Sequence, residues 1–179
     1  KVGNGLNVLA IGRLLNSQKA FDLLLAAHRQ NIAGGMNYHL TILGEGSDRV
    51  ALEKYIQEHQ LSSYTSLLGF QDNPYPYITG SDLFVMSSLY EGYPVVLVEA
   101  MTLGKAIIST ACTGPKEALN DGEFGYLVPV NDVQALAKGM KTLLGDQESR
   151  ERYASLSRHR ADIFSFERSM KDVEHLLDT

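Results

Sequence analysis

Apolar and polar positions along the chain predict strands that alternate with helices. Short continuous apolar runs, typical of strands buried on both faces, fall at residues 6–12, 38–43, 64–68, 83–86, 106–109 and 126–128. Segments with apolar residues at helical spacing separate them, at residues 19–30, 48–58, 75–79, 94–103, 116–119 and 133–144. The pattern predicts an α/β fold with a doubly wound, parallel six-stranded sheet of Rossmann-like type.

The rest of the chain is predicted to be helical and charged from Gln147 onward, with residues 164–166 dividing two final helices. A length of 179 residues fits one domain, so we expect residues 1–179 to fold as a single unit. The chain begins at Lys1 without a methionine and reaches a strand within a few residues. We therefore expect a fragment of a longer protein.

Five loops are expected to meet where a ligand would bind. In a parallel sheet the carboxyl ends of the strands lie at one edge, and ligands of such folds sit beyond that edge. The loops that fall there are residues 12–19, 44–47, 70–73, 87–94 and 113–115. The fourth of these leads into a helix in which Pro94 suits the first position and Gly104 the end.

The start of that helix is suited to an anion. We expect free N–H groups at residues 93–96, which together with the helix dipole would favour a phosphate. Acidic residues near a helix start also favour the dipole without any ligand, so this spacing alone favours a structural role. Glu91 in the loop and Glu99 inside the helix would not face each other, which disfavours a glycosidase-type pair.

Two cations follow the first strand. Arg13 and Lys19 could neutralise a diphosphate, or could be an ordinary exposed arginine and a lysine at a helix start. A lysine at that position opposes the helix dipole, which favours another role. After the second strand, Gly44 and Gly46 lack the third glycine of a dinucleotide fingerprint because Arg49 occupies its place, which disfavours NAD.

Charge and composition exclude several classes of protein. A net charge of -5 and a pI near 5.5 disfavour nucleic-acid binding, and no apolar run approaches the roughly 18 residues of a membrane span. A single cysteine, Cys112, excludes an internal disulfide and fits a reducing, cytoplasmic location. No His or Lys stands beside Cys112 in sequence, so we expect a core residue, although a spatial neighbour could still activate it.

The histidines show no metal-ligand spacing. We expect His28 at the wet edge of its helix, and we expect surface or edge positions for His39, His59, His159 and His175.

Residue identity around the central helix carries a family resemblance. Glu91 and Glu99, with Ser88-Leu89-Tyr90 before them and Ala100-Met101 and Gly104 after them, closely resemble the E-x7-E signature of retaining glycosyltransferases of family four, which have the GT-B fold. Further matches in the same order are Gly12-Arg13-Leu14 with Lys19, Leu43-Gly44-Glu45-Gly46, Leu68-Gly69-Phe70, Gly80-Ser81-Asp82 and residues 122–128. The resemblance covers about residues 5–145, and it departs at Ala20 (usually glycine), Ser87 (often proline) and Lys105-Ala106.

The resemblance implies a role for each matching residue of a donor-binding, C-terminal half. Arg13, Lys19 and Glu91 would be catalytic: the two cations would hold the diphosphate of a nucleotide sugar, and Glu91 would contact sugar hydroxyls. Glu99 would bind the ribose hydroxyls. The other donor-binding residues would be Gly12 at the diphosphate, Phe70 beside the base, and Gly92, Tyr93, Pro94 and Val95 with backbone near the sugar. Tyr90 and Tyr93 could pack near the sugar or be ordinary half-buried aromatics.

The implied reaction is transfer of a sugar from a nucleoside diphosphate sugar, with UDP favoured, to an acceptor with retention, in bacterial polysaccharide or glycolipid synthesis. No D-x-D occurs, so we expect no metal, and we expect no cofactor. The acceptor would bind a separate N-terminal domain that this chain lacks, so the chain alone would transfer little, and any membrane association would belong to the intact protein. The alternatives are a nucleotide-binding module and a lobe of a sugar-nucleotide epimerase.

Overall fold

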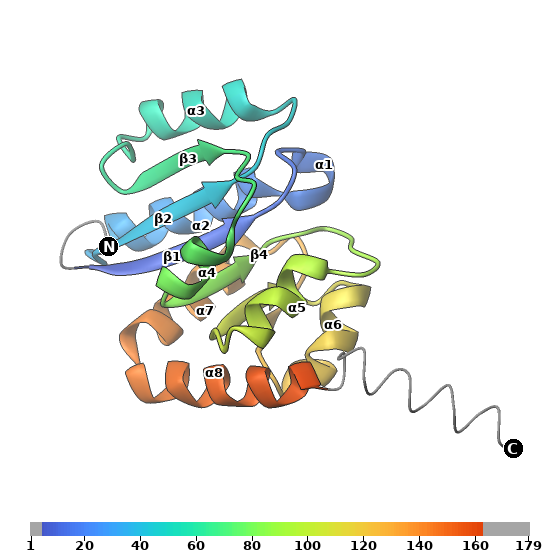
Figure 1. Ribbon diagram of the computed structural model, residues 1–179. Coiled ribbons are helices and arrows are strands. Elements are labelled where there is room, and N and C mark those ends of the chain that lie inside the picture. Colours follow the sequence, from blue (N-terminus) through green and yellow to red (C-terminus); the bar gives the residue numbers. More distant parts are fainter. Residues whose placement is uncertain (1–4, 163–179) are drawn as a thin grey trace, which may run out of the picture.

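Six parallel strands form one sheet, in the order β3-β2-β1-β4-β5-β6, in a computed structural model that describes residues 5–162 (Figure 1). The strands are β1 (Leu6–Ile11), β2 (Tyr38–Leu43), β3 (Thr65–Gly69), β4 (Leu83–Met86), β5 (Ile107–Thr110) and β6 (Tyr126–Val128). The parallel six-stranded sheet expected from the apolar runs is confirmed, and each strand begins and ends within one residue of its predicted bounds.

Helices connect the strands. They are α1 (Asn16–Lys19), α2 (Phe21–Ala33), α3 (Arg49–Glu58), α4 (Tyr75–Gly80), α5 (Val95–Thr102), α6 (Thr113–Ala118), the 3₁₀ turn η1 (Asn120–Gly122), α7 (Val133–Gly145) and α8 (Gln147–Ala161). Asp132 caps α7 by accepting a hydrogen bond from the N–H of Ala135 at 2.8 Å. The predicted division at residues 164–166 lies outside the described residues. None of the described helices is long and apolar enough to cross a membrane.

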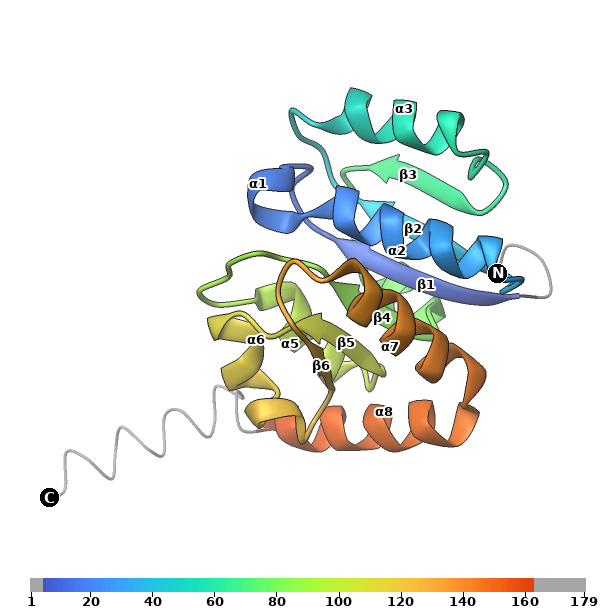
Figure 2. The ribbon, with the colours of Figure 1, turned by 180° about the vertical axis from the view of Figure 1, so that it is seen from behind.

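Helices cover both faces of the sheet. One apolar core joins the sheet to α2, α3 and α7, and α2 and α7 lie in front of the strands in Figure 2. The other core joins the opposite face to α4, α5 and α6, and it includes Ala161 at the end of α8 (Figure 1). Because strands between two such layers are buried on both sides, their residues need to be apolar in succession, which explains the unbroken apolar runs.

The chain reverses its direction of travel across the sheet between β1 and β4. From β1 the strands are added outward to β2 and β3, and the chain then returns to place β4 on the other side of β1. The connections after β1 and β4 therefore leave the shared edge in opposite directions. A crevice opens at this point in doubly wound sheets, and the site described below lies there.

A histidine of α2 is buried against the sheet, contrary to expectation. His28 is fully buried against the ring of Tyr38, with centroids 4.9 Å apart, and His39 is buried on β2. The predictions that His28 lies at a wet helix edge and His39 at the surface or an edge are wrong, because His28 packs against the sheet and His39 lies on a strand in its interior. Neither His28 ring nitrogen has a hydrogen-bond partner among the described residues. Burial, with a smaller effect of His39, lowers the pKa of His28 to about 4.

This burial predicts an acid-sensitive fold. The unfolded chain takes up a proton at His28 near pH 6.5 while the folded protein does not, so the free energy of unfolding should fall as pH falls from about 6.5 toward 4. The expected slope is about 1.4 kcal/mol per pH unit, measured by urea unfolding at pH 7 and pH 5. A His28→Leu variant should lose most of this slope. An unchanged slope in that variant would assign the effect to other groups.

Candidate functional site

A cleft of about 580 Å³ lies at the carboxyl edge of the sheet, beside the point where the strand order reverses. Three of the predicted site residues line it: Gly12, Arg13 and Phe70. The other lining residues come from the ends of β1 and β2 and from the chain around α4 and α5, namely Ile11, Leu43, Gly44, Glu45, Gln71, Asp72, Pro74 and Val96. Three of the five expected loops therefore share this cleft, whereas the loops at residues 87–94 and 113–115 contribute no lining residue.

Phe70 and Arg13 are the exposed members of this cleft. Phe70 is 70% exposed, which is unusual for a large apolar residue and leaves its ring accessible to a ligand in the cleft. Arg13 is exposed, and its guanidinium makes no hydrogen bond or ion pair with another described residue. A free guanidinium and an open aromatic ring on one cleft could together hold an anionic ligand that carries a ring.

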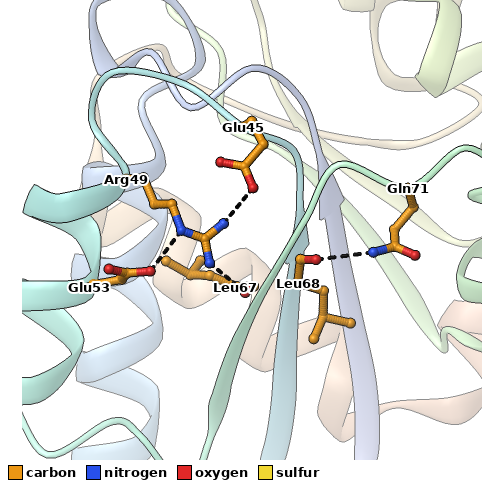
Figure 3. A network of polar contacts seen from close by, with 6 residues as sticks. All are labelled: Glu45, Arg49, Glu53, Leu67, Leu68 and Gln71. Carbon is orange, nitrogen blue, oxygen red and sulfur yellow. Dashed lines mark hydrogen bonds and ion pairs between the residues drawn. The ribbon is translucent and has the colours of Figure 1, made fainter.

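A structural arginine fixes the wall of the cleft on the β2–β3 side (Figure 3). The Arg49 guanidinium donates to Glu45 and Glu53, each at 2.8 Å, and to the carbonyl of Leu67 at 3.3 Å. Gln71, on the loop after β3, donates to the carbonyl of Leu68 at 3.0 Å. Arg49 thus joins the loop after β2 to strand β3, which is a structural role at the position of the missing third glycine.

Lys19 and Glu91 form an ion pair next to the cleft. Lys19 comes from the connection after β1 and Glu91 from the loop after β4, so the pair bridges the strand reversal. The two side chains are only 14% and 12% exposed, so each charge is largely removed from water and depends on the other. Ser88 adds a hydrogen bond to the same Glu91 oxygen at 3.3 Å.

Lys19 reaches Glu91 by passing over Gly12. A Cβ at position 12 would lie 3.2 Å from Lys19 Cε and 3.3 Å from Cδ, so a larger residue there would displace the lysine stem. Gly12 therefore leaves room for the Lys19 side chain. The family resemblance implies a different role for Gly12, which is close approach of the backbone to the ligand.

The local structure around Lys19 differs from the prediction. The sequence predicts one helix over residues 19–30, whereas Lys19 ends the single turn α1 and Ala20, at φ 48° and ψ 48°, separates it from α2. Lys19 is therefore at a helix C-terminus, where a cation is favourable. The expectation of an electrostatically misplaced lysine is wrong. The left-handed conformation of Ala20 gives a physical reason for a glycine at this position in the resembling family.

The start of α5 also differs in detail from the prediction. Pro94 is the residue before the helix, and the N–H of Val95 donates to the carbonyl of Tyr93 at 3.0 Å, so it is not free. Gly92, Tyr93 and Val95 are exposed beside the cleft, whereas Pro94 is buried. Tyr90 and Tyr93 are 58% and 64% exposed, so neither is an ordinary half-buried aromatic.

Glu99 has a partner that the sequence did not reveal. Tyr75, at the start of α4, donates its hydroxyl to Glu99 Oε1 at 3.2 Å. The charge of Glu99, and then this hydrogen bond, raise the pKa of the Tyr75 phenol. Tyr75 directly follows Pro74, which lines the cleft, so the pair stands at the cleft's margin. The only sequence signal for Tyr75 is its position just after the loop 70–73.

Cys112 is buried before α6, as expected. Burial raises the pKa of its thiol, and the charge of Glu91 raises it further, so thiolate formation is opposed although the charge of Lys19 lowers the pKa. Within residues 5–162, no group of three His, Cys, Asp or Glu side chains could hold a metal ion. His59 and His159 lie at or near the surface, and His175 lies outside the described residues.

Known proteins are similar to this chain in sequence. The model of the family described as glycosyl transferases group 1 matches residues 2–160. An N-acetylgalactosaminyltransferase of Campylobacter jejuni, named for an undecaprenol diphosphate-linked acceptor, is 33% identical over 93% of this chain and 45% of its own length. The lipopolysaccharide core glycosyltransferase LpsE of Rhizobium meliloti is 31% identical over 82% of this chain and 42% of its own. This chain spans less than half the length of these curated relatives.

A solved structure shares the fold. The crystal structure of S. aureus TarM in complex with UDP superposes with a TM-score of 0.87 at 22% identity, covering 100% of this chain and 38% of TarM. The fold of this chain therefore matches part of the longer TarM chain.

The left-handed backbone at Ala20 predicts that a glycine substitution there leaves the stability of the protein almost unchanged. Ala20→Gly removes about 1 kcal/mol of left-handed strain, which offsets the loss of a buried methyl worth about 0.8 kcal/mol. We expect the free energy of unfolding to change by less than about 0.5 kcal/mol in urea titrations. The control is Ala27→Gly, at a buried position inside α2, which should cost about 2 kcal/mol. Equal losses in the two variants would contradict the assigned conformation.

Proposed function

Because the chain belongs to the glycosyl transferases group 1 family, we propose that it is the nucleotide-sugar donor-binding half of a retaining glycosyltransferase of family four type. The observation that carries the proposal is the placement of Arg13, Lys19 and Glu91 together at the strand reversal, beside a cleft lined by Phe70. Doubly wound sheets bind nucleotides at this point. The domain that binds the acceptor would belong to the rest of the protein.

The diphosphate of the donor would lie between Arg13 and Lys19. Arg13 is unpaired within the described part of the chain and can turn toward an anion, while Lys19 would exchange Glu91 for a phosphate oxygen. Gly12 has no side chain to displace the Lys19 stem, and its backbone would approach the diphosphate. Two cations near the departing nucleoside diphosphate supply the charge stabilisation that a metal provides in other enzymes, so we propose a metal-independent reaction.

The remaining residues would orient the nucleoside and the sugar. Phe70 would lie against the base, and Glu99, held by Tyr75, would accept hydrogen bonds from the ribose hydroxyls. Glu91, once released from Lys19, would accept hydrogen bonds from the sugar. The backbone of residues 92–95 would lie along the sugar and the phosphates.

The reaction would break the bond between the anomeric carbon of the sugar and the diphosphate oxygen. The acceptor oxygen would form its bond to the same carbon on the same face, so the configuration is retained. The nucleoside diphosphate leaves with the bonding electron pair, and the acceptor proton passes to the departing phosphate. No cofactor takes part.

We favour UDP as the nucleotide and a bacterial polysaccharide or glycolipid as the product. UDP is the nucleotide in the TarM complex, and the similar proteins of C. jejuni and R. meliloti carry the names of glycan-assembling enzymes. The intact protein would work in the cytoplasm, and any attachment to a membrane would involve its other half.

Calorimetric titration of the chain with UDP, GDP and ADP tests the donor site. UDP should bind saturably, with and without a chelator. Lys19→Met and Glu99→Ala should each weaken binding by about 10-fold to 100-fold, because each removes a hydrogen bond to a charged group worth about 1.5–3 kcal/mol. Lys138→Met, at an exposed lysine on α7, is the matched control and should bind normally. Equal UDP affinity in all four proteins would contradict the site.

Transfer is tested in the intact protein that carries this chain. The anomeric configuration of the product, followed by NMR, should match that of the donor. Combining Lys19→Ala with Glu99→Ala should abolish transfer. If transfer survives both changes, the assignment of these residues fails; an epimerised nucleotide sugar without transfer would instead favour the epimerase alternative.

A further inference from the structure

The loop after β4 is bonded directly to the turn that carries Lys19. Ser87 donates its hydroxyl to the backbone carbonyl of Lys19 at 2.7 Å, and the N–H of Leu89 donates to the carbonyl of Gln18, also at 2.7 Å. Ser87 is 2% exposed, so water does not compete for this bond. The ion pair of Lys19 with Glu91 is thus the third contact between the same two segments.

These bonds satisfy groups that α1 cannot satisfy itself. The last carbonyls of any helix lack partners within it, and a single turn has little stability of its own. Ala20 turns the chain away in the left-handed conformation, and its N–H reaches only the carbonyl of Asn16. The carbonyls of Gln18 and Lys19 are instead bonded by the loop after β4, so this loop fixes the orientation of the turn.

The loop itself is held firmly on its other side. Thr110, at the end of β5, donates its hydroxyl to the carbonyl of Ser88 at 2.6 Å. The N–H of Gly114 donates to the carbonyl of Glu91 at 2.9 Å. A Cβ at Gly114 would lie 2.3 Å from the carbonyl oxygen of Gly92, so α6 is packed tightly against this loop. Ser87 therefore connects the Lys19 turn to a fixed part of the sheet.

We propose that Ser87 is a positioning residue for Lys19: its hydroxyl holds the backbone at residue 19 so that the ammonium reaches across Gly12 to the anion site. The inference rests on the proposed function, since that anion would be the donor diphosphate. Ser87 stands where the resembling family often has proline, which has no hydroxyl, so this chain has a hydrogen bond at this point that proline could not form.

A double-mutant cycle with UDP tests the proposal by calorimetry. Ser87→Ala should weaken UDP binding about 5-fold when Lys19 is present. In a Lys19→Met background, which keeps the stem over Gly12 but removes the charge, Ser87→Ala should have no further effect on UDP affinity. The same 5-fold loss in both backgrounds would overturn the proposal, because Ser87 would then act independently of the ammonium.

Two further variants separate positioning from stability. Ser87→Thr keeps the hydroxyl and should restore UDP affinity even if its extra methyl lowers the melting temperature. Ser81→Ala removes a similar buried bond, from Ser81 to the carbonyl of Ile78 at 2.8 Å at the end of α4, away from the cleft. It should lower the melting temperature as Ser87→Ala does but leave UDP affinity unchanged. If Ser87→Thr binds like Ser87→Ala, or if Ser81→Ala weakens UDP equally, the proposal fails.

Failure of the proposed function would be recognised separately, because the unchanged chain would then bind no UDP. In that case the four proteins of the double-mutant cycle (the unchanged chain, Ser87→Ala, Lys19→Met and the double variant) would be compared by urea unfolding. Positioning requires the effects of Ser87→Ala and Lys19→Met on unfolding to be non-additive, since the two groups act through one contact. Additive effects would overturn the inference without reference to any ligand.

Discussion

The pairing of β1 with β4 at the centre of the sheet is the constraint on which the site depends. These strands are neighbours in space, although the paired residues Val8 and Leu83 are 75 positions apart in sequence. Because the connections after them leave in opposite directions, neither connection can cover the space between the strand ends. The protein places its two opposite charges, Lys19 and Glu91, on the two sides of that space.

Burying those charges has a structural consequence. An ammonium and a carboxylate that are mostly removed from water are each costly alone, so removal of one partner leaves the other uncompensated. The surrounding bonds from Ser87, Ser88 and Gly114 keep both segments close enough for the pair to form. The same arrangement that stabilises the resting protein thus keeps a lysine and a glutamate at the edge of the cleft.

Much of the fold could be predicted because its signals are local. Unbroken apolar runs follow directly from burial on both faces, and the loops between them could be assigned to one edge from the parallel arrangement alone. The contacts that refine the site are long-range and have no local signal: Tyr75 with Glu99, and Ser87 with Lys19. The break at Ala20 was missed because an alanine side chain gives no indication of a left-handed backbone. His28 was misplaced because its burial is produced by elements that follow it in the chain.

The ion pair of Lys19 and Glu91 also bears on selectivity. The ammonium gives up its hydration when the protein folds, so a ligand that takes this lysine replaces a carboxylate and not water. A neutral molecule of suitable shape gains nothing from that exchange, since it would leave two separated charges in a poorly solvated place. A ligand that displaced Glu91 from Lys19 would therefore have to bring negative charge of its own.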